Sequence, residues 1–417
     1  MLLFMNAEII AVGSEMLTPQ RTDTNSLYLT AELNNLGVEV VTKSVIGDDR
    51  DRLADAVRRA VNRHAIVILC GGLGPTEDDV TREAVAQALD RKLVFHAEIA
   101  QALEQRFAAF KRKMAEINKR QAFVIEGACI LANDRGTAPG LWVEESGAFV
   151  MLLPGPPHEL KAMFERQCLP RLTRVVPRQA IRTAFLRVTG MSESDLDTLI
   201  APVYTKYDNP VTTILAANGD LQIHLRARCV TEADADALLA EVVAPIECLL
   251  GDRLYSRNGD ALEVVVGEML RRNHSTVSVA ESATGGMLGE RFTSVPGSSD
   301  YFAGGFITYT NAMKTELLGV PAELLEEHGA VSKEVAEAMA VGACRRTGST
   351  YALAITGVAG PDSGGESAPV GTVYVAIADA SAVHSFHRQF LGDRQRIRNF
   401  TCQMALDILR RRITARP

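Results

Sequence analysis

Two segments in the last third of the chain carry the residue types that amide hydrolysis requires. SVAESATGGMLGERF places Ser282 on a turn that leaves an expected strand and enters an expected helix, and GGFITYTNAMK carries Tyr309 and Lys314. Hydrolysis of an amide needs a nucleophile and a group that takes its proton and returns it to the leaving amine. No histidine lies in either segment. We therefore expect Ser282 as the nucleophile with Lys314 or Tyr309 as the base, in place of a Ser-His-Asp triad.

Each of these three residues also has a purely structural interpretation. Ser282 could cap the following helix, Tyr309 could be a strand-end aromatic packed in the core, and Lys314 could be solvated on a helix surface. The helix N-terminus after Ser282 is expected to offer free backbone N–H groups. Such groups can stabilise an oxyanion or hold a phosphate.

Further residues of this region are suited to binding a phosphorylated substrate. LGDRQRIR places Arg394 in the first turn of the last expected helix, where its charge opposes the helix dipole unless an anion is bound. Its guanidinium fork matches a phosphate group. ITGVAGPDSGG ends an expected strand at Thr356 and enters a glycine-rich loop. The residues that we expect to contact the substrate are Thr284, Gly285, Gly286, Asn311, Thr356, Gly357 and Arg394.

Glycines and carboxylates gather in the first part of the chain. CGGLGPTEDDVTREA follows an apolar segment directly, so its glycines are expected at the carboxyl end of a parallel strand, where open α/β sheets bind ligands. A glycine loop can cradle phosphate with its N–H groups, and carboxylates can hold a divalent metal with its waters. Asp78 or Asp79 could instead cap the next helix. We predict Gly71, Gly72 and Gly74 as binding residues, and Asp23, Asp78 and Asp79 as metal ligands.

The hydrophobic periodicity predicts the elements that must position these residues. In the first third, apolar strands such as 8–12 and 65–70 alternate with amphipathic helices, which predicts a doubly wound α/β sheet. A long helix is expected at 97–120. A small α+β module and a C-terminal α/β domain follow, the latter with a strand at 306–310. The predicted domains are 1–172, 177–252 and 258–417.

The composition excludes several classes of protein. The chain of 417 residues suits two or three domains, and its net charge of −7 does not suit a dedicated nucleic-acid binder. Its seven cysteines are scattered without a CxxC pair, which argues against a zinc site or a disulfide framework. The segment MLLFMNAEII is not a signal peptide, and no apolar stretch reaches the ~18–20 residues that span a bilayer. We expect a cytoplasmic protein without membrane contact.

Together the C-terminal motifs resemble the nicotinamide-nucleotide amidase domain of the CinA (competence/damage-inducible) family and of the stand-alone enzyme PncC. The resemblance covers residues 258–415. It implies hydrolysis of the carboxamide of nicotinamide mononucleotide to nicotinate mononucleotide and ammonia, without a cofactor in this domain. Ala283 departs from the cysteine that often follows the serine in similar proteins.

The N-terminal motifs resemble the other half of the same family, whose fold is like that of molybdopterin-binding proteins. This resemblance implies a pyrophosphatase that cleaves ADP-ribose with a divalent metal, taken as Mg²⁺. It adds Glu193, in VTGMSESDLD, as a further metal ligand, and implies a homodimer with nucleotides as ligands. The segment MLTPQRT replaces a glycine-rich turn of similar proteins and could reshape the mouth of the site.

Two other functions stay open from the sequence. A molybdopterin-handling protein would use the N-terminal fold but would leave the amidase motifs without a role. A non-enzymatic partner in competence or recombination would not need the catalytic residues. The acidic charge counts against direct contact of such a partner with DNA, but it does not count against contact with another protein.

Overall fold

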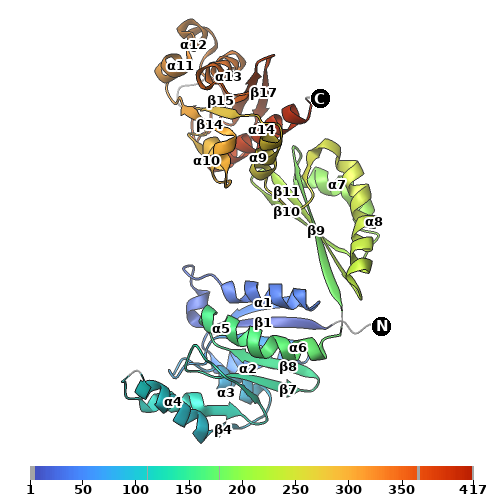
Figure 1. The fold of residues 1–417 in the computed structure, drawn as a ribbon, viewed down its shortest axis with the longest axis vertical. Coiled ribbons are helices and arrows are strands. Elements are labelled where there is room, and N and C mark those ends of the chain that lie inside the picture. Colours follow the sequence, from blue (N-terminus) through green and yellow to red (C-terminus); the bar gives the residue numbers. More distant parts are fainter. Residues whose placement is uncertain (1–4, 110, 178, 364–366, 416–417) are drawn as a thin grey trace. The chain divides into compact units, whose positions relative to one another are not determined.

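The computed structural model describes residues 5–109, 111–177, 179–363 and 367–415, and Figure 1 labels its elements. The chain divides into two compact units, residues 1–182 with 228–235 and residues 183–227 with 236–417. All seven cysteines are free, and three of them are buried. Among the described residues, no helix combines the length and the apolar character that crossing a membrane requires.

The first unit is built on a six-stranded sheet covered on both faces, as the sequence predicts. The central strand β3 (Ile66–Cys70) is buried along its whole length, because helices cover both of its faces. Val67 and Leu69 pack with α2 and α3, whereas Ile66 and Ile68 pack with α1, α5 and α6. The strand order is β2-β1-β3-β8-β7-β6, with β7 antiparallel to its neighbours. The other strands are β1 (Asn6–Val12), β2 (Glu39–Ile46), β6 (Cys129–Leu131), β7 (Gly140–Glu145) and β8 (Ala148–Leu153).

The helices of this unit follow the predicted rhythm, with one exception. The helix expected at 97–120 ends at Ala109, and a short 3-10 helix covers Glu116–Ala122. Lys111 takes a left-handed φ of 55°, and the N–H groups of Lys111 and Arg112 bond back to Ala108 and Phe107, which ends the helix. The helices are α1 (Thr24–Asn35), α2 (Arg50–Val61), α3 (Thr81–Ala88), α4 (Ala97–Ala109), α5 (Pro157–Met163) and α6 (Leu169–Val175), and β4 (Leu93–Phe95) pairs with β5 (Phe123–Ile125).

The second unit begins with a four-stranded sheet in the order β10-β11-β9-β12. Alternate residues of β11 are buried, the pattern of a sheet with one face covered, here by α7 and α8 (Figure 1). Its elements are β9 (Ala180–Thr189), α7 (Glu193–Tyr204), β10 (Val211–Ala217), β11 (Asp220–Cys229), α8 (Glu232–Leu250) and β12 (Leu254–Ser256).

The rest of this unit is a five-stranded sheet in the order β14-β13-β15-β16-β17, with helices on both faces (Figure 1). One face carries valine, leucine and isoleucine against α9, α10 and α14. The other face carries alanines, such as Ala280, Ala352 and Ala354, so α13 packs close to the sheet. The strands are β13 (Val277–Glu281), β14 (Phe302–Ile307), β15 (Tyr351–Gly357), β16 (Thr372–Asp379) and β17 (Val383–Gln389). The helices are α9 (Leu262–Arg272), α10 (Met287–Thr293), α11 (Asn311–Leu318), α12 (Ala322–His328), α13 (Lys333–Thr347) and α14 (Arg394–Thr414).

The strand expected at 306–310 lies earlier and ends at Ile307. Thr310 is instead the N-cap of α11, and its side chain accepts a hydrogen bond from the N–H of Met313. Tyr309 therefore lies in the loop between β14 and α11, and Lys314 lies inside the helix.

We predict that Gly342→Ala destabilises the C-terminal sheet domain although alanine is the better helix former. A Cβ at position 342 of α13 would lie 2.2 Å from the carbonyl oxygen of Leu318, so backbone must move. The gain in helix propensity is about 1 kcal/mol, and overpacking of this kind costs about 1–3 kcal/mol. Thermal unfolding should therefore give a lower midpoint. Val341→Ala, at an exposed position of the same helix, is the control and should leave the midpoint within error. A midpoint raised by Gly342→Ala would contradict this packing.

Candidate functional site

Ser282 is the first residue after β13 in the C-terminal sheet. Its N–H donates to the carbonyl oxygen of Ile355 on the neighbouring parallel strand β15, at 3.0 Å. This bond extends the strand pairing by one residue and fixes the start of the turn. The serine hydroxyl is thereby held at the carboxyl end of the sheet, where α/β folds place their ligands.

Lys314 lies beside this serine although the two residues come from different segments. Its Nζ is 3.4 Å from the Ser282 Oγ and donates to the carbonyl oxygen of Thr308 at 3.1 Å. The side chain is only 1% exposed, so the interpretation of Lys314 as a solvated helix residue is wrong. A buried lysine needs such hydrogen bonds because burial without them is costly. The geometry thus pairs a partly exposed hydroxyl with a buried amine.

The helix after Ser282 does not offer the free N–H groups that the sequence predicts. The Glu281 carboxylate, 1% exposed, accepts hydrogen bonds from the N–H groups of Gly286, Leu288 and Gly289 at 3.0, 3.1 and 2.8 Å. Three backbone donors compensate the burial of this carboxylate. These groups are therefore unavailable to a ligand, and they instead fix the turn that carries Ser282.

A cavity of about 290 Å³ opens at Ser282 and collects most of the predicted residues. The Arg394 guanidinium donates to the carbonyl oxygen of Gly360 at 2.7 Å and to the Tyr309 hydroxyl at 3.4 Å. Tyr309 is 61% exposed, so it is not the core aromatic of the alternative interpretation. No histidine is among the described residues that line this cavity. The predicted residues in the lining are Ser282, Tyr309, Asn311, Lys314, Thr356, Gly357 and Arg394.

Two of the lining residues are already used inside the protein. The buried Thr356 hydroxyl donates to the carbonyl oxygen of Ala330 at 2.7 Å, so it can only accept a hydrogen bond from a ligand. A Cβ on Gly357 would lie 2.8 Å from the carbonyl oxygen of Thr372, so this glycine serves close strand packing.

Three predicted substrate contacts lie outside the cavity lining. Thr284 is buried and its carbonyl oxygen accepts from Arg398 at 2.6 Å. Gly285 and Gly286 have left-handed φ angles of 57° and 96°, which the turn requires. The end of the ITGVAGPDSGG motif, residues 364 and 365, lies outside the described residues.

Sequence reasoning missed residues that support the site. Glu281, at the end of β13, acts through its carboxylate on backbone N–H groups, and Thr308 holds Lys314 through its backbone carbonyl oxygen. Asp362 and Ser363 join the cavity lining from the glycine-rich loop. An acidic residue at the end of an otherwise apolar strand was the available signal for Glu281.

The first unit has a cavity of about 580 Å³ at the carboxyl ends of its central strands. The strands β1 and β3 are adjacent there and their connections run to opposite faces, so this is the switch point of the sheet. The lining includes Met16, Arg21 and Thr22. The segment MLTPQRT, which differs from the glycine-rich turn of similar proteins, therefore forms part of the wall. The predicted residues in the lining are Gly71, Gly72, Gly74, Asp23 and Asp79.

The backbone N–H groups of Gly71 and Gly74 in the glycine loop of this cavity are hydrogen-bonded within the protein. The N–H of Gly71 donates to the carbonyl oxygen of Leu153 at 3.0 Å, and the N–H of Gly74 donates to Asp79 at 2.8 Å. The buried Arg82 guanidinium donates to the carbonyl oxygens of Leu73 and Gly74. The prediction of a phosphate cradle is therefore wrong for the N–H groups of Gly71 and Gly74, because internal acceptors occupy them.

The four predicted metal ligands do not assemble into one site. Among the described residues, no group of three or more His, Cys, Asp or Glu side chains is placed to hold a metal ion. Asp23 caps α1, and Asp79 accepts from the N–H of Thr76 at 2.9 Å. Asp78 is not part of the cavity lining, and contacts with Thr76 lower its pKa. Neither Asp78 nor Asp79 caps α3, whose N-cap is Val80. Glu193 belongs to the second unit, at the start of α7.

The wall of the first cavity is rich in hydrogen-bond acceptors. Gln121 is 1% exposed and its Nε2 donates to Thr137, while its Oε1 is buried without a partner. The Oδ1 of Asn25 is likewise buried without a partner, while its Nδ2 donates to Gly155. Burial raises the pKa of the Cys70 thiol, which keeps it protonated at neutral pH. Such a wall calls for a ligand that donates hydrogen bonds.

Three family models match the chain: the probable molybdopterin binding domain over residues 8–174, the damage-inducible protein CinA KH domain over 183–256 and the CinA C-terminal domain over 259–413. The chain is 76% identical to a CinA-like protein of Solibacter usitatus over 412 residues, 99% of either chain. It is 49% identical to a CinA-like protein of Koribacter versatilis over 98% of this chain and 100% of that protein. The crystal structure of the competence/damage inducible protein CihA from Agrobacterium tumefaciens is 37% identical, with a TM-score of 0.35, over 36% of this chain and 92% of that one.

We predict that Glu281→Gln loosens the turn that carries Ser282. The amide has one acceptor oxygen, so at least one of the three backbone N–H groups loses its partner. A buried donor left without a partner costs about 1–3 kcal/mol. Hydrogen exchange at Gly286, Leu288 and Gly289 should become faster and the unfolding midpoint should fall. Glu290→Gln, at an exposed position of α10, is the control and should change neither. Unchanged exchange in Glu281→Gln would show that the carboxylate does not hold the turn.

Proposed function

The chain belongs to the CinA family, and from this membership we propose that the Ser282 cavity hydrolyses the carboxamide of nicotinamide mononucleotide. The products are nicotinate mononucleotide and ammonia. The observation that carries the proposal is the distance of 3.4 Å between the buried Lys314 Nζ and the Ser282 Oγ. A serine activated by a neighbouring base is the arrangement that acyl transfer requires.

In the proposed reaction the neutral amine of Lys314 takes the hydroxyl proton as the Ser282 Oγ attacks the carboxamide carbon. The C–N bond of the resulting tetrahedral intermediate then breaks, and the lysine returns the proton to the departing ammonia. An ester between Ser282 and the nicotinoyl group remains. Water, deprotonated by the same amine, cleaves this ester and restores the serine hydroxyl.

The remaining lining residues suit recognition of the nucleotide. Arg394 is held by Gly360 and Tyr309, so its guanidinium is ordered before a substrate binds. We propose that it pairs with the substrate phosphate, for which its fork is well shaped. Tyr309 then positions Arg394 at the exposed edge of the cavity, and Lys314 alone acts as the base. Asn311 is proposed to bond to the substrate from the start of α11.

For the cavity of the first unit we propose a nucleotide ligand, with cleavage of ADP-ribose as the finer form of the proposal. The wall supports a ligand that donates hydrogen bonds, because the acidic Glu15 belongs to the lining and the buried Oε1 of Gln121 lacks a donor. Ribose hydroxyls supply such donors, whereas a bare pyrophosphate supplies none. Within the part of the chain that the structure describes, no group of His, Cys, Asp or Glu side chains is placed to hold a metal ion, and we derive no step through a metal.

The domain boundaries 1–172, 177–252 and 258–417 and the homodimer also stay proposals. The three matched regions end within a few residues of these boundaries, which supports them.

A non-enzymatic role in competence is the second candidate function, and a relative from Caldicellulosiruptor bescii bears the name putative competence-damage inducible protein.

We predict that Ser282→Ala abolishes ammonia release from nicotinamide mononucleotide. Loss of the nucleophile should lower kcat by roughly a thousandfold or more, since catalysis by such a unit collapses when one member is removed. Lys314→Met should lose activity to a similar extent, because the methionine has no proton acceptor. Ammonia release is measured on the purified full chain.

The control for this prediction is Ser299→Ala, an exposed serine that should leave kcat unchanged. Tyr309→Phe separates the two possible bases: it should retain most of the kcat and raise KM, because it releases Arg394. A loss in Tyr309→Phe as large as in Lys314→Met would place the base at Tyr309. Full biological function of a Ser282→Ala strain would favour the non-enzymatic role.

We predict that Gln121→Leu weakens the binding of ADP-ribose to the first unit by about tenfold, the usual effect of one hydrogen bond to a buried group. Because the Oε1 has no partner in the free protein, the unfolding midpoint should fall by less than the tenfold loss of affinity would correspond to in free energy. Calorimetric titration measures the affinity, with a pterin as the comparison ligand. Gln87→Leu, on the surface between α2 and α3, is the control. Equal affinity of the wild type and Gln121→Leu would contradict the proposal.

A further inference from the structure

A second hollow of the C-terminal sheet domain has no part in the proposed amidase site. It has a volume of about 610 Å³, within the range of small-molecule sites, and it runs along α14 between β17 and the loop after β9. We call it the α14 hollow. None of its described lining residues belongs to the Ser282 cavity. The two hollows therefore border different stretches of the same helix, the Ser282 cavity at Arg394 and the α14 hollow from Phe400 to Arg411.

The floor of the α14 hollow is apolar and in part open to water. Phe386 on the edge strand β17 is 41% exposed, and Phe400 on α14 is half-buried beside Gly219. Aromatic surface left in water favours a flat apolar partner. The apolar residues of the floor are Met191, Phe386, Phe390, Phe400, Met404 and Ile408.

The wall of the α14 hollow is cationic in a chain of net charge −7. Arg253, Arg388 and Arg411 belong to the lining, and Asp407 is the one acidic residue among the described lining residues. Asp407 already bonds to both Arg410 and Arg411. Arg388 donates to a backbone carbonyl oxygen, and the described contacts give neither it nor Arg253 a carboxylate partner. The hollow therefore attracts an anion.

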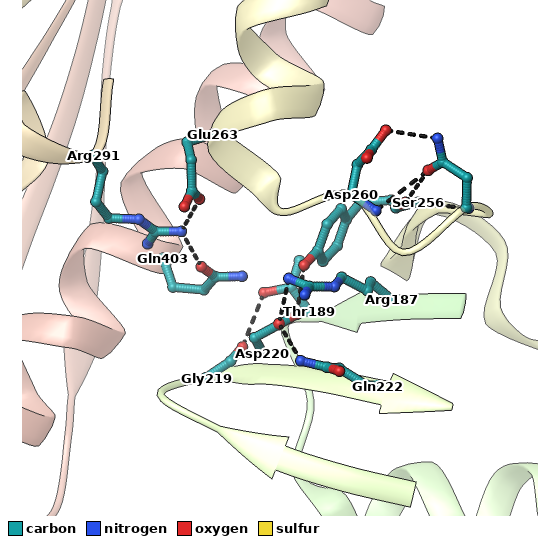
Figure 2. A network of polar contacts seen from close by, with 12 residues as sticks. Arg187, Thr189, Gly219, Asp220, Gln222, Ser256, Asp260, Glu263, Arg291 and Gln403 are labelled. Carbon is teal, nitrogen blue, oxygen red and sulfur yellow. Dashed lines mark hydrogen bonds and ion pairs between the residues drawn. The ribbon is translucent and has the colours of Figure 1, made fainter. Parts of the chain in front are cut away.

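A buried donor in the same lining points to the same kind of ligand. Gln403 on α14 is 4% exposed, and its Oε1 accepts from Arg291 at 2.9 Å. Its Nε2 is buried without a hydrogen-bond partner. Figure 2 shows this nitrogen on the side of the amide away from Arg291, toward the strand that carries Thr189. Thr189 also belongs to the lining, with its hydroxyl donating to the carbonyl oxygen of Gly219. Unpaired buried donors are rare in folded proteins, and this one requires an acceptor atom.

We propose that the α14 hollow is a binding site for a small aromatic organic anion, such as an aromatic carboxylate or phosphate. The flat body contacts the phenyl rings of the floor, and the anionic group meets the guanidinium groups of Arg388 and Arg253. An acceptor oxygen of the ligand takes the free N–H of Gln403. This site is separate from the proposed amidase reaction and does not depend on it.

The experiment uses two fluorescent probes with nearly the same rings, anilinonaphthalenesulfonate and its uncharged relative N-phenylnaphthylamine. Each is titrated into the folded full chain. The wild type should bind the sulfonate at least about tenfold tighter than the uncharged probe, as one charged hydrogen bond implies. Arg388→Gln should remove most of this difference. Arg272→Gln, whose exposed side chain pairs with Glu268, is the matched control and should keep it.

Gln403→Glu is the sharper variant because it keeps the acceptor for Arg291 and replaces the free N–H donor by a carboxylate oxygen. It should abolish sulfonate binding while ammonia release stays unchanged, and the buried carboxylate should lower the unfolding midpoint without unfolding the chain at the assay temperature. Equal affinity for the two probes in the wild type would overturn the proposal. Sulfonate binding that survives both Arg388→Gln and Gln403→Glu would also overturn it. A hollow closed by a second copy would bind neither probe, and that result would overturn it in favour of a self-association surface.

Discussion

The buried carboxylate of Glu281 makes the contact on which the geometry of the Ser282 cavity depends. It joins the end of β13 to the start of α10 through three backbone N–H groups, and Ser282 lies at the beginning of the turn between them. Ser282 is fixed from the other side by its own N–H on Ile355. With the turn held at both ends, the hydroxyl lies 3.4 Å from the Lys314 Nζ. The N–H groups that the sequence predicts to be free for a ligand instead hold the turn that carries Ser282.

The two faces of the C-terminal sheet carry different side chains and pack against different helices. The face with alanines lets α13 approach closely, and the segment that precedes this helix supplies Ala330, whose carbonyl oxygen holds the Thr356 hydroxyl. The face with large side chains packs against α9, α10 and α14. Arg394 at the N-terminus of α14 belongs to the lining of the Ser282 cavity, while the middle of the helix borders a hollow of different chemistry.

Much of the fold and part of the candidate site could be predicted from the sequence, because both follow from periodicity and from residue type. Buried strands such as β3 can be predicted because they are continuous apolar segments of the sequence. Ser282, Lys314 and Arg394 can be predicted because they are reactive or charged residues near the ends of expected strands and helices. The rest depends on contacts between side chains and nearby backbone. The Glu281 carboxylate accepts from N–H groups five to eight residues later in the chain, and the Asp79 carboxylate accepts from the N–H of Gly74 earlier in the chain. Such contacts follow from the shape of a turn, which periodicity does not encode.

In the proposed reaction, Ser282 attacks the carboxamide and carries the acyl group as an ester. Hydroxylamine intercepts such an ester faster than water does, so running the reaction in hydroxylamine tests for it. We predict a nicotinoyl hydroxamate of the mononucleotide with the wild type, in proportion to the ammonia released, and none with Ser282→Ala. Ammonia release by the wild type without hydroxamate, together with an unmodified Ser282 in rapidly quenched samples, would contradict it.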